Sequence, residues 1–282
     1  MTLSGRAKLA GVMGWPVSHS LSPRLHGFWL ERHGVDGAYL PLPVRPEAFE
    51  SSLHALADLG FRGVNVTLPH KEAALDVCDE VEPRARRIGA VNTVVIEDGR
   101  LLGSNSDAFG FLENLRAGAP SWRPEAADAL VLGAGGAARA VLAALLDAGT
   151  PRVRLANRTR ARAEALAADF GPKVEPADWS GRNEALAGCG LLVNTTSLGM
   201  AGDASLDIDL GAMRSEGLVN DIVYNPLETP LLAAAKARGL TTVDGLGMLL
   251  HQARPGFEAW FGPRPTVDEA LRRFVLEGLS GA

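Results

Sequence analysis

The stretch Ala129-Leu130-Val131-Leu132-Gly133-Ala134-Gly135-Gly136-Ala137-Ala138 decides the fold of this chain. Four apolar residues predict a short buried strand, a glycine-rich turn follows, and an Ala/Leu-rich run predicts a helix to about Asp147. The pattern G-x-G-x-x-A between strand and helix is typical of a dinucleotide-binding unit. Gly133 would permit the tight turn, Gly135 would let the backbone approach a pyrophosphate, and Ala138 would let helix and strand pack closely. The alternative is a tight turn without a ligand.

The next predicted strand, 153–156, ends in Asn157-Arg158-Thr159-Arg160. An NAD site usually carries an acidic residue at this strand end, where it binds the ribose 2′-hydroxyl, and this chain has none there. A guanidinium group pairs with phosphate in bidentate geometry, so the Arg-bearing strand end suits a 2′-phosphate. We therefore predict NADP as the cofactor. The alternative is that Arg158 and Arg160 only begin a solvated helix face.

A second chemical signal is Asn65-Val66-Thr67-Leu68-Pro69-His70-Lys71, which follows an apolar run. Only four of the 28 basic residues are Lys, so a Lys at this point is unusual for the chain. Lys can release and regain a proton in a suitable environment, whereas Arg cannot. Lys71 is therefore a candidate general acid/base in a small-molecule site. The alternative is an exposed Lys at the start of a helix.

Composition narrows the class of protein. A chain of 282 residues predicts two domains or one large one. A net charge of −5 and the lack of a basic stripe argue against a nucleic-acid partner. Cys78 and Cys189 show neither disulfide nor metal spacing, which predicts a reducing, cytoplasmic location and no metal. We see no signal peptide and no apolar run of ~18 residues, so no membrane partner is expected.

Alternating strand and helix signals predict an α/β fold of two units with mainly parallel sheets. The polar or glycine-rich loops that follow the predicted strands lie at 18–20, 67–71, 92–93, 133–138, 157–159, 194–197 and 221–225. Ligands of such sheets bind at the carboxyl ends of the strands, so one cleft between two domains would explain these loops together. The sequence Thr266-Val267-Asp268-Glu269 predicts a capping box for the last helix.

In their order and spacing, the polar motifs resemble those of the shikimate dehydrogenase family over nearly the whole chain. The matching stretches are 16–23 (PVSHSLSP), 65–71 (NVTLPHK), 89–93 (GAVNT), 105–107 (NSD), 133–138 (GAGGAA), 157–159 (NRT), 194–200 (NTTSLGM), 221–226 (DIVYNP) and 244–248 (DGLGM) with Gln252.

The resemblance implies an NADP-dependent oxidoreductase that reduces 3-dehydroshikimate reversibly to shikimate, in the shikimate pathway of aromatic amino-acid biosynthesis. It implies an N-terminal substrate domain, 1–107, completed by C-terminal helices in 246–282, and a Rossmann NADP-binding domain, 108–245. The expected partner is the small-molecule substrate, and the expected state is a monomer or homodimer.

The resemblance also assigns residues. Lys71 and Asp107 would form the catalytic pair, and Ser18 and Ser20 would bind the substrate carboxylate. The remaining substrate-binding residues would be Asn65, Thr67, Asn92, Asp107 and Gln252 at the ring hydroxyls, with Tyr224 nearby. The cofactor would contact Gly133, Ala134, Gly135, Gly136, Ala137, Asn157, Arg158, Thr159, Thr195, Ser197, Ile222, Gly245 and Met248.

Two departures from the family pattern bear on these assignments. Ala108 stands where the family more often has Gly, which matters only if that backbone needs a positive φ. Pro255 follows Gln252 closely, and proline fits the first turn of a helix but not its middle. The alternatives are a quinate or aminoshikimate dehydrogenase of the same family, and a non-catalytic NADP-binding sensor. Ser18-His19-Ser20 as a hydrolase site is disfavoured, because no G-x-S-x-G elbow is present.

Overall fold

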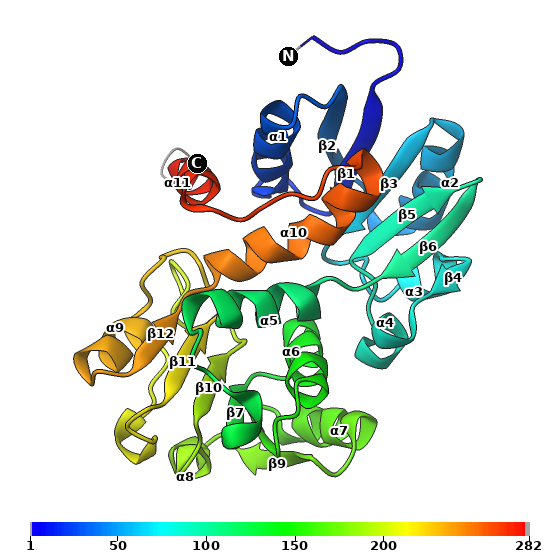
Figure 1. Ribbon diagram of the computed structural model, residues 1–282. Coiled ribbons are helices and arrows are strands. Elements are labelled where there is room, and N and C mark those ends of the chain that lie inside the picture. Colours follow the sequence, from blue (N-terminus) through cyan, green and yellow to red (C-terminus); the bar gives the residue numbers. More distant parts are fainter. Residues whose placement is uncertain (1, 280–282) are drawn as a thin grey trace. The chain divides into compact units, whose positions relative to one another are not determined.

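The structure, a computed structural model, describes residues 2–279. The chain divides into two compact units (Figure 1). Unit 1 comprises the described residues up to Ser106 and from Leu250 onward, and unit 2 comprises Asp107–Leu249. Residues 1 and 280–282, which belong to the predicted domain ranges, lie outside the described residues.

Unit 1 is built on a six-stranded sheet in the order β2-β1-β3-β5-β6-β4. Its strands are β1 (Lys8–Gly14), β2 (Gly37–Pro43), β3 (Phe61–Val66), β4 (Glu80–Val81), β5 (Thr93–Glu97) and β6 (Arg100–Ser104). Its helices are α1 (Ser22–Arg32), η1 (Pro46–Ala48), α2 (Phe49–Asp58), α3 (Ala74–Val77), α4 (Pro83–Ile88) and α11 (Glu269–Glu277), with most of α10 (Leu246–Phe261). Strand β1 pairs parallel with β2 and β3, while the hairpin β5–β6 makes the middle of the sheet antiparallel.

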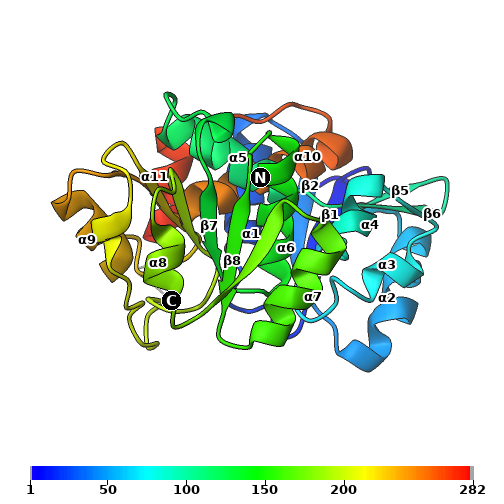
Figure 2. The same cartoon turned by 90° about the horizontal axis from the view of Figure 1, so that it is seen from below.

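Unit 2 is built on a fully parallel sheet in the order β12-β11-β10-β7-β8-β9. Its strands are β7 (Ala129–Leu132), β8 (Val153–Asn157), β9 (Val174–Asp178), β10 (Leu191–Asn194), β11 (Leu218–Asp221) and β12 (Thr241–Val243). Its helices are α5 (Asp107–Gly118), η2 (Pro124–Ala126), α6 (Gly136–Asp147), α7 (Arg160–Phe170), α8 (Arg182–Leu186), η3 (Leu210–Ala212) and α9 (Pro230–Ala237). The strand order is that of a Rossmann fold, and helices cover both faces of the sheet (Figure 2).

The prediction of two α/β units is therefore confirmed. Strand β7 is entirely buried because helices cover both faces of its sheet, which is why its four residues are all apolar. The Asp98-Gly99 turn joins β5 and β6, with both residues at the positive φ that an Asp-Gly pair favours in a two-residue hairpin turn.

The structure differs from two local predictions: the capping box of the last helix was wrong, and the rule that excluded Pro255 from the middle of a helix was too strict. The last helix has no capping box, since its N-cap is Asp268, whose side chain accepts from the Leu271 amide. The carbonyl of Thr266 instead accepts from the Trp29 indole. Pro255 lies in the middle of α10 without ending it, because packing of this helix on unit 1 outweighs the one helical hydrogen bond that proline removes.

Aromatic rings fix α10 to the sheet of unit 1. Phe257 and Trp260 are fully or almost fully buried, and the Trp260 indole donates to the carbonyl of Val94 on β5 at 3.1 Å. Gly63 lies beneath this ring, where a Cβ atom would approach the indole nitrogen to within 2.3 Å. A glycine at 63 is thus required for α10 to pack on the sheet of unit 1.

His26 is the most unusual side chain of this core. It is fully buried and stacks on Tyr39, with 3.9 Å between ring centroids and 2° between ring planes. Among the described residues neither ring nitrogen has a hydrogen-bond partner. Burial lowers the pKa of His26 from 6.5 to about 3, so the imidazole is neutral in the folded protein at neutral pH.

We predict that His26 makes unfolding easier as the pH falls. Below about pH 6.5 the unfolded chain protonates His26 while the folded chain does not, so the free energy of unfolding drops by roughly 1.4 kcal/mol per pH unit. His26→Phe keeps the stacked ring and removes this loss. Urea titrations of both proteins between neutral and acidic pH should therefore diverge as the pH falls. Parallel curves would contradict the prediction.

Candidate active site

The loop after β1 presents hydroxyl groups at the carboxyl edge of the sheet of unit 1. Ser18 is exposed, and Ser20 is half-buried with its Oγ accepting from the Ser22 amide at 3.3 Å. The hydroxyl proton of Ser20 is not used in this bond and can be donated to an anion. Gly14 ends β1 beside Thr67, and a Cβ at Gly14 would lie only 2.4 Å from the Thr67 methyl. The two predicted substrate loops therefore meet here.

The Asn65 amide is fixed by an unpredicted partner, Tyr39. The Tyr39 hydroxyl donates to Asn65 Oδ1 at 2.6 Å, and Asn65 Nδ2 donates to the carbonyl of Asn92 and to Thr93 Oγ1. Both amide hydrogens are used in these bonds, so Asn65 can offer a ligand only the second lone pair of its oxygen.

A second amide, Asn92, joins three segments of unit 1. Its Oδ1 accepts from the Ser106 amide at 2.8 Å, from the Ser106 hydroxyl at 3.2 Å and from Thr93 Oγ1 at 2.9 Å. The Ser106 hydroxyl also lies 3.4 Å from Gln252 Oε1 on α10. The structure thus brings Gln252 into the same polar cluster as Asn65 and Asn92, despite Pro255.

The two predicted catalytic residues occupy different units. Lys71 lies in the turn between β3 and α3, and its carbonyl accepts from the Val91 amide, one residue before Asn92. Asp107 is the first residue of α5 and follows Ser106 directly in the chain. Ala108 is helical, so the departure from glycine there causes no backbone strain. His70, next to Lys71, is buried, stacks on Phe49 and contacts the Val44 carbonyl, which gives it a structural role.

The glycine-rich turn of unit 2 contains two kinds of glycine. Gly133 has a φ of 103°, and a Cβ there would lie 2.6 Å from Thr195 Oγ1, so the fold itself requires glycine. Gly135 and Gly136 face open space, where a Cβ would meet nothing within 4 Å. Gly135 is also the N-cap of α6 and provides no side-chain cap, so the first amides of this long helix remain for an external acceptor.

The two arginines that follow β8, Arg158 and Arg160, differ in their contacts. Arg160 is held by Glu164 at 2.7 Å and Asp178 at 2.6 Å, and these bonds raise its pKa further above its ordinary value. Arg158 is exposed and forms no ion pair within the described part of the chain. Asn157 Oδ1 accepts from the Ala134 amide and so ties this loop to the glycine turn. Of the two, Arg158 is the one available to a phosphate.

The loops after β10 and β11 are joined by a buried carboxylate, Asp221. Its Oδ1 accepts from Asn194 Nδ2 and the Val223 amide, and its Oδ2 accepts from the Thr229 hydroxyl at 2.7 Å. Burial raises the pKa of Asp221 and outweighs these hydrogen bonds, which lower it. Gly245 closes the same region, since a Cβ there would lie 2.1 Å from the Ile222 carbonyl.

The predicted cofactor residues therefore all lie in unit 2, and most line the carboxyl edge of its sheet. Tyr224, a predicted substrate residue, follows β11 at this edge, and burial raises the pKa of its hydroxyl. Among residues 2–279, no group of His, Cys, Asp or Glu could hold a metal ion, and none of the helices could serve as a membrane span. A Rossmann sheet with an open phosphate turn, together with a separate unit that holds a buried amide cluster, defines a two-unit dinucleotide-dependent dehydrogenase.

Comparisons with known proteins give the family. Residues 12–94 match the shikimate dehydrogenase substrate binding domain, and residues 121–199 match the shikimate / quinate 5-dehydrogenase family. The chain is 64% identical to the shikimate dehydrogenase (NADP(+)) of Paramagnetospirillum magneticum over 97% of this chain and 100% of that protein. It is 63% identical to the shikimate dehydrogenase (NADP(+)) of Rhodospirillum rubrum, over 97% of this chain and 99% of that protein. This chain belongs to the shikimate dehydrogenase family.

Solved structures agree. The shikimate 5-dehydrogenase of Thermus thermophilus, in complex with NADP(H) and shikimate, is 43% identical with a TM-score of 0.85, covering 96% of this chain and 99% of that one. The quinate dehydrogenase of Corynebacterium glutamicum, in complex with NAD, is 32% identical with a TM-score of 0.89, covering 96% and 99%.

Sequence reasoning missed the residues that orient the amides. Thr93 and Ser106 lie inside recognised motifs but were not assigned a role, and Tyr39 lies outside every motif. The sequence signal for Thr93 and Ser106 was that each carries a hydroxyl group and is the chain neighbour of a predicted substrate-binding residue, Asn92 or Asp107. No local signal identified Tyr39, because its contact with Asn65 spans 26 residues of sequence and depends on the pairing of β1 with both β2 and β3.

We predict that Asp221→Ala lowers the free energy of unfolding by about 2–4 kcal/mol, because it leaves the Thr229 hydroxyl and the Val223 amide without their buried acceptor. Asp221→Asn should cost less, since an amide oxygen can replace one carboxylate oxygen. Asp203→Ala, at an exposed position of the same unit, serves as the control and should change little. Guanidinium denaturation measures all three, and equal stability of Asp221→Ala and the parent would refute this role.

Proposed function

We propose that this chain catalyses the reversible NADP-dependent reduction of 3-dehydroshikimate to shikimate. The observation that carries the proposal is the amide cluster of buried Asn65 and Asn92 with half-buried Gln252, in a chain of the shikimate dehydrogenase family. Amides held in fixed orientation suit the recognition of several hydroxyl groups on one ring, because each offers a defined donor or acceptor.

The substrate is proposed to bind through its carboxylate and its hydroxyls. Ser18 and Ser20 donate to the carboxylate, and Ser20 retains its proton for this bond. Asn65 can only accept, so the ring hydroxyl next to it donates. Thr67, Asn92, Asp107 and Gln252 complete the contacts to the ring, with Tyr224 nearby.

Reduction of the ketone needs a hydride at carbon and a proton at oxygen. Bound NADPH supplies the hydride. Lys71 Nζ donates the proton to the developing alkoxide and takes it back in the reverse direction. Asp107 orients the ammonium group and contacts a ring hydroxyl. The substrate-binding loops hold the substrate carbonyl next to Lys71. These loops contribute to catalysis by orienting the substrate and take no part in the bond changes.

The residues of unit 2 fit a phosphorylated dinucleotide. Gly135 and Gly136 leave open the space in front of the uncapped amino end of α6, where a pyrophosphate would accept from backbone amides. Arg158 provides a guanidinium group for a 2′-phosphate, with Asn157 and Thr159 beside it. Thr195, Ser197, Ile222, Gly245 and Met248 are proposed to contact the remainder of the cofactor.

Location and assembly form part of the proposal. Cys78 and Cys189 are both buried free thiols, and burial raises the pKa of each to about 11, so they stay protonated. This is the cysteine usage of a protein in a reducing compartment, and we propose that the enzyme works in the cytoplasm as a monomer or homodimer.

One assay tests the function and its alternatives together. Purified protein should reduce NADP⁺ with shikimate, followed at 340 nm, and kcat/KM should be compared with quinate and with NAD⁺ in parallel. A quinate or aminoshikimate dehydrogenase would show a higher kcat/KM for its own substrate. A non-catalytic sensor would bind NADP⁺ by calorimetry without turnover.

Arg158→Ala should raise the KM for NADP⁺ about 5–100-fold and leave kcat almost unchanged, because a phosphate contact made equally in ground and transition states is lost. The KM for NAD⁺, which lacks the 2′-phosphate, should not rise. Arg160→Ala is the matched control: it removes a guanidinium two residues away that is paired with Glu164 and Asp178. Similar effects of the two substitutions on NADP⁺ would argue against a specific phosphate contact at Arg158.

Lys71→Ala should lower kcat by roughly 10²–10⁴-fold with a much smaller change in the KM for shikimate, because a general acid acts mainly in the transition state. Lys71→Arg should not restore activity, since guanidinium does not release its proton near neutral pH. Lys173→Ala, at an exposed site, is the control.

Asp107→Asn should also lower kcat, and the double variant should lose less than the product of the two single losses, as expected for groups that act as a unit. Steady-state kinetics of the single and double variants measure this coupling. Full activity of Lys71→Ala would overturn its catalytic role, and simple multiplication of the losses would overturn the pairing.

A further inference from the structure

Tyr39 on β2 combines a packed ring with a hydroxyl that reaches the proposed substrate site. The side chain is buried, and its ring stacks on His26 and lies near Trp260. Its hydroxyl donates to Asn65 Oδ1 at 2.6 Å. Phenylalanine would fill the apolar part of this space, and burying a hydroxyl costs free energy unless it is hydrogen-bonded. The Tyr39 hydroxyl therefore calls for an explanation that packing does not give.

The direction of each hydrogen bond at Asn65 is fixed by a main-chain carbonyl. The carbonyl of Asn92 can only accept, so the group 3.1 Å from it is the amide nitrogen of Asn65, Nδ2. The same nitrogen donates to Thr93 Oγ1 at 3.2 Å, which uses its second hydrogen. Oδ1 of Asn65 therefore faces Tyr39. Because an amide oxygen can only accept, the Tyr39 hydroxyl must be the donor.

Ser22, which is buried at the start of α1, extends this series of hydrogen bonds beyond Tyr39. Burial raises the pKa of Tyr39 well above its ordinary value, and a hydrogen bond with the Ser22 side chain partly offsets that rise. The single proton of the Tyr39 hydroxyl is given to Asn65, so the Ser22 hydroxyl donates to Tyr39. The Ser22 amide donates to Ser20 Oγ at 3.3 Å. The series thus connects the proposed carboxylate loop with the proposed ring-hydroxyl site.

We propose that Tyr39 is a positioning residue that sets which hydrogen-bonding groups of the substrate Asn65 accepts, an inference that rests on the proposed function. The Tyr39 hydroxyl occupies one lone pair of Asn65 Oδ1 and holds the carboxamide, so that only the other lone pair is available to the substrate. Asn65 then selects a substrate hydroxyl that donates and disfavours a group that can only accept. Tyr39 acts through Asn65 and needs no contact of its own with the substrate.

Tyr39→Phe keeps the ring and removes only the hydroxyl. It should raise the KM for shikimate about 3–10-fold, as expected for one lost hydrogen bond in a buried site. The value of kcat should stay within about twofold of the parent, because this contact is made equally in the ground state and the transition state. The KM for NADP⁺ should not change. Steady-state kinetics measure these values, and calorimetric titration with shikimate checks that KM follows the binding of the substrate.

Deoxy analogues of shikimate test the contact through Asn65 directly. Each of 4-deoxyshikimate and 5-deoxyshikimate lacks one of the two hydroxyls that do not react. The increase in KM caused by Tyr39→Phe should disappear for one analogue, the one without the hydroxyl that faces Asn65, and should keep its full size for the other. Equal increases for both analogues would show a general loss of structure and would overturn the proposal.

Ser22→Ala tests the series of hydrogen bonds at a second position. It keeps the amide that donates to Ser20 and removes the hydroxyl next to Tyr39. The KM for shikimate should rise about 2–5-fold, less than in Tyr39→Phe, because Tyr39 can still donate to Asn65. The double variant should resemble Tyr39→Phe alone, since the Ser22 hydroxyl acts only through Tyr39. Multiplication of the two single effects would contradict this series.

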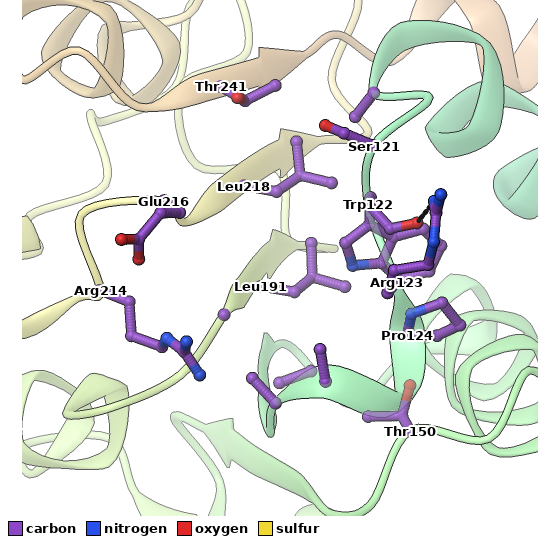
Figure 3. Close-up of a pocket in the computed structure, with 15 residues that line it drawn as sticks. Ser121, Trp122, Arg123, Pro124, Thr150, Leu191, Arg214, Glu216, Leu218 and Thr241 are labelled. Atoms are coloured by element: carbon purple, nitrogen blue, oxygen red, sulfur yellow. Dashed lines mark hydrogen bonds between the residues drawn. The ribbon is translucent and has the colours of Figure 1, made fainter.

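Two controls separate the proposed role from general loss of structure. Trp29→Phe removes a hydrogen bond that another buried ring of unit 1 donates, at 3.0 Å to the carbonyl of Thr266, and this bond does not involve Asn65. Thr150→Val removes a buried hydroxyl of unit 2 that has no hydrogen-bond partner among the described residues. Thr150 belongs to the wall of a pocket where β7, β10, β11 and β12 begin (Figure 3). Both variants should keep the KM for shikimate near that of the parent.

The outcomes separate this proposal from the proposed function. A parent protein without turnover of shikimate would overturn the proposed function, and this inference with it. An active parent whose KM for shikimate is the same in Tyr39→Phe would overturn this inference alone. The same holds if Trp29→Phe raises that KM as much as Tyr39→Phe does. If Tyr39→Phe does not fold, an unchanged KM in Ser22→Ala overturns the inference, and a selective increase supports it.

Discussion

The polar network of unit 1 depends on one atom, the carboxamide oxygen of Asn92. It accepts from Thr93 and twice from Ser106, and the Ser106 hydroxyl reaches Gln252, so one buried atom connects the start of β5, the residues after β6 and helix α10. Such a network must be fully satisfied, because each unpaired group in a buried site costs free energy. Asp107 follows Ser106 directly, so the same bonds that hold the amides also fix the backbone from which the proposed catalytic carboxylate departs.

How much of this could be read from the sequence depends on the range of the interaction. The strand–turn–helix at 129–138 and the hairpin at Asp98-Gly99 were predictable, because their signals lie within a few residues. Tyr39 was not, since its role arises only when separate strands pair. The prediction of a capping box at Thr266 was wrong for a related reason. The Trp29 indole donates a hydrogen bond to the Thr266 carbonyl, and Asp268 caps the helix in place of Thr266. Tertiary contacts decided between two locally acceptable caps.

The glycines of the nucleotide turn show why a motif does not by itself reveal a ligand. Gly133 is required by the fold, because its φ is positive and Thr195 occupies the space of a side chain. A turn without any ligand would need it equally. Gly135 and Gly136 have no such internal reason, and side chains there would project into open space. Only these two positions distinguish a phosphate turn from a tight turn, and the distinction needs coordinates because all three are the same letter in the sequence.

A few side chains must select the substrate and the cofactor, because relatives that bind other ligands share the same fold. A quinate dehydrogenase in complex with NAD has the same architecture. Within the strand end 157–160, the two arginines look equivalent in sequence, yet Arg160 is bound to Glu164 and Asp178 while Arg158 faces solvent. Exposed ion pairs stabilise a fold little, but they fix the direction of a side chain. The pairing of Arg160 thus supports the α7 side of the loop, and it leaves Arg158 as the residue that we propose to distinguish a 2′-phosphate from a 2′-hydroxyl.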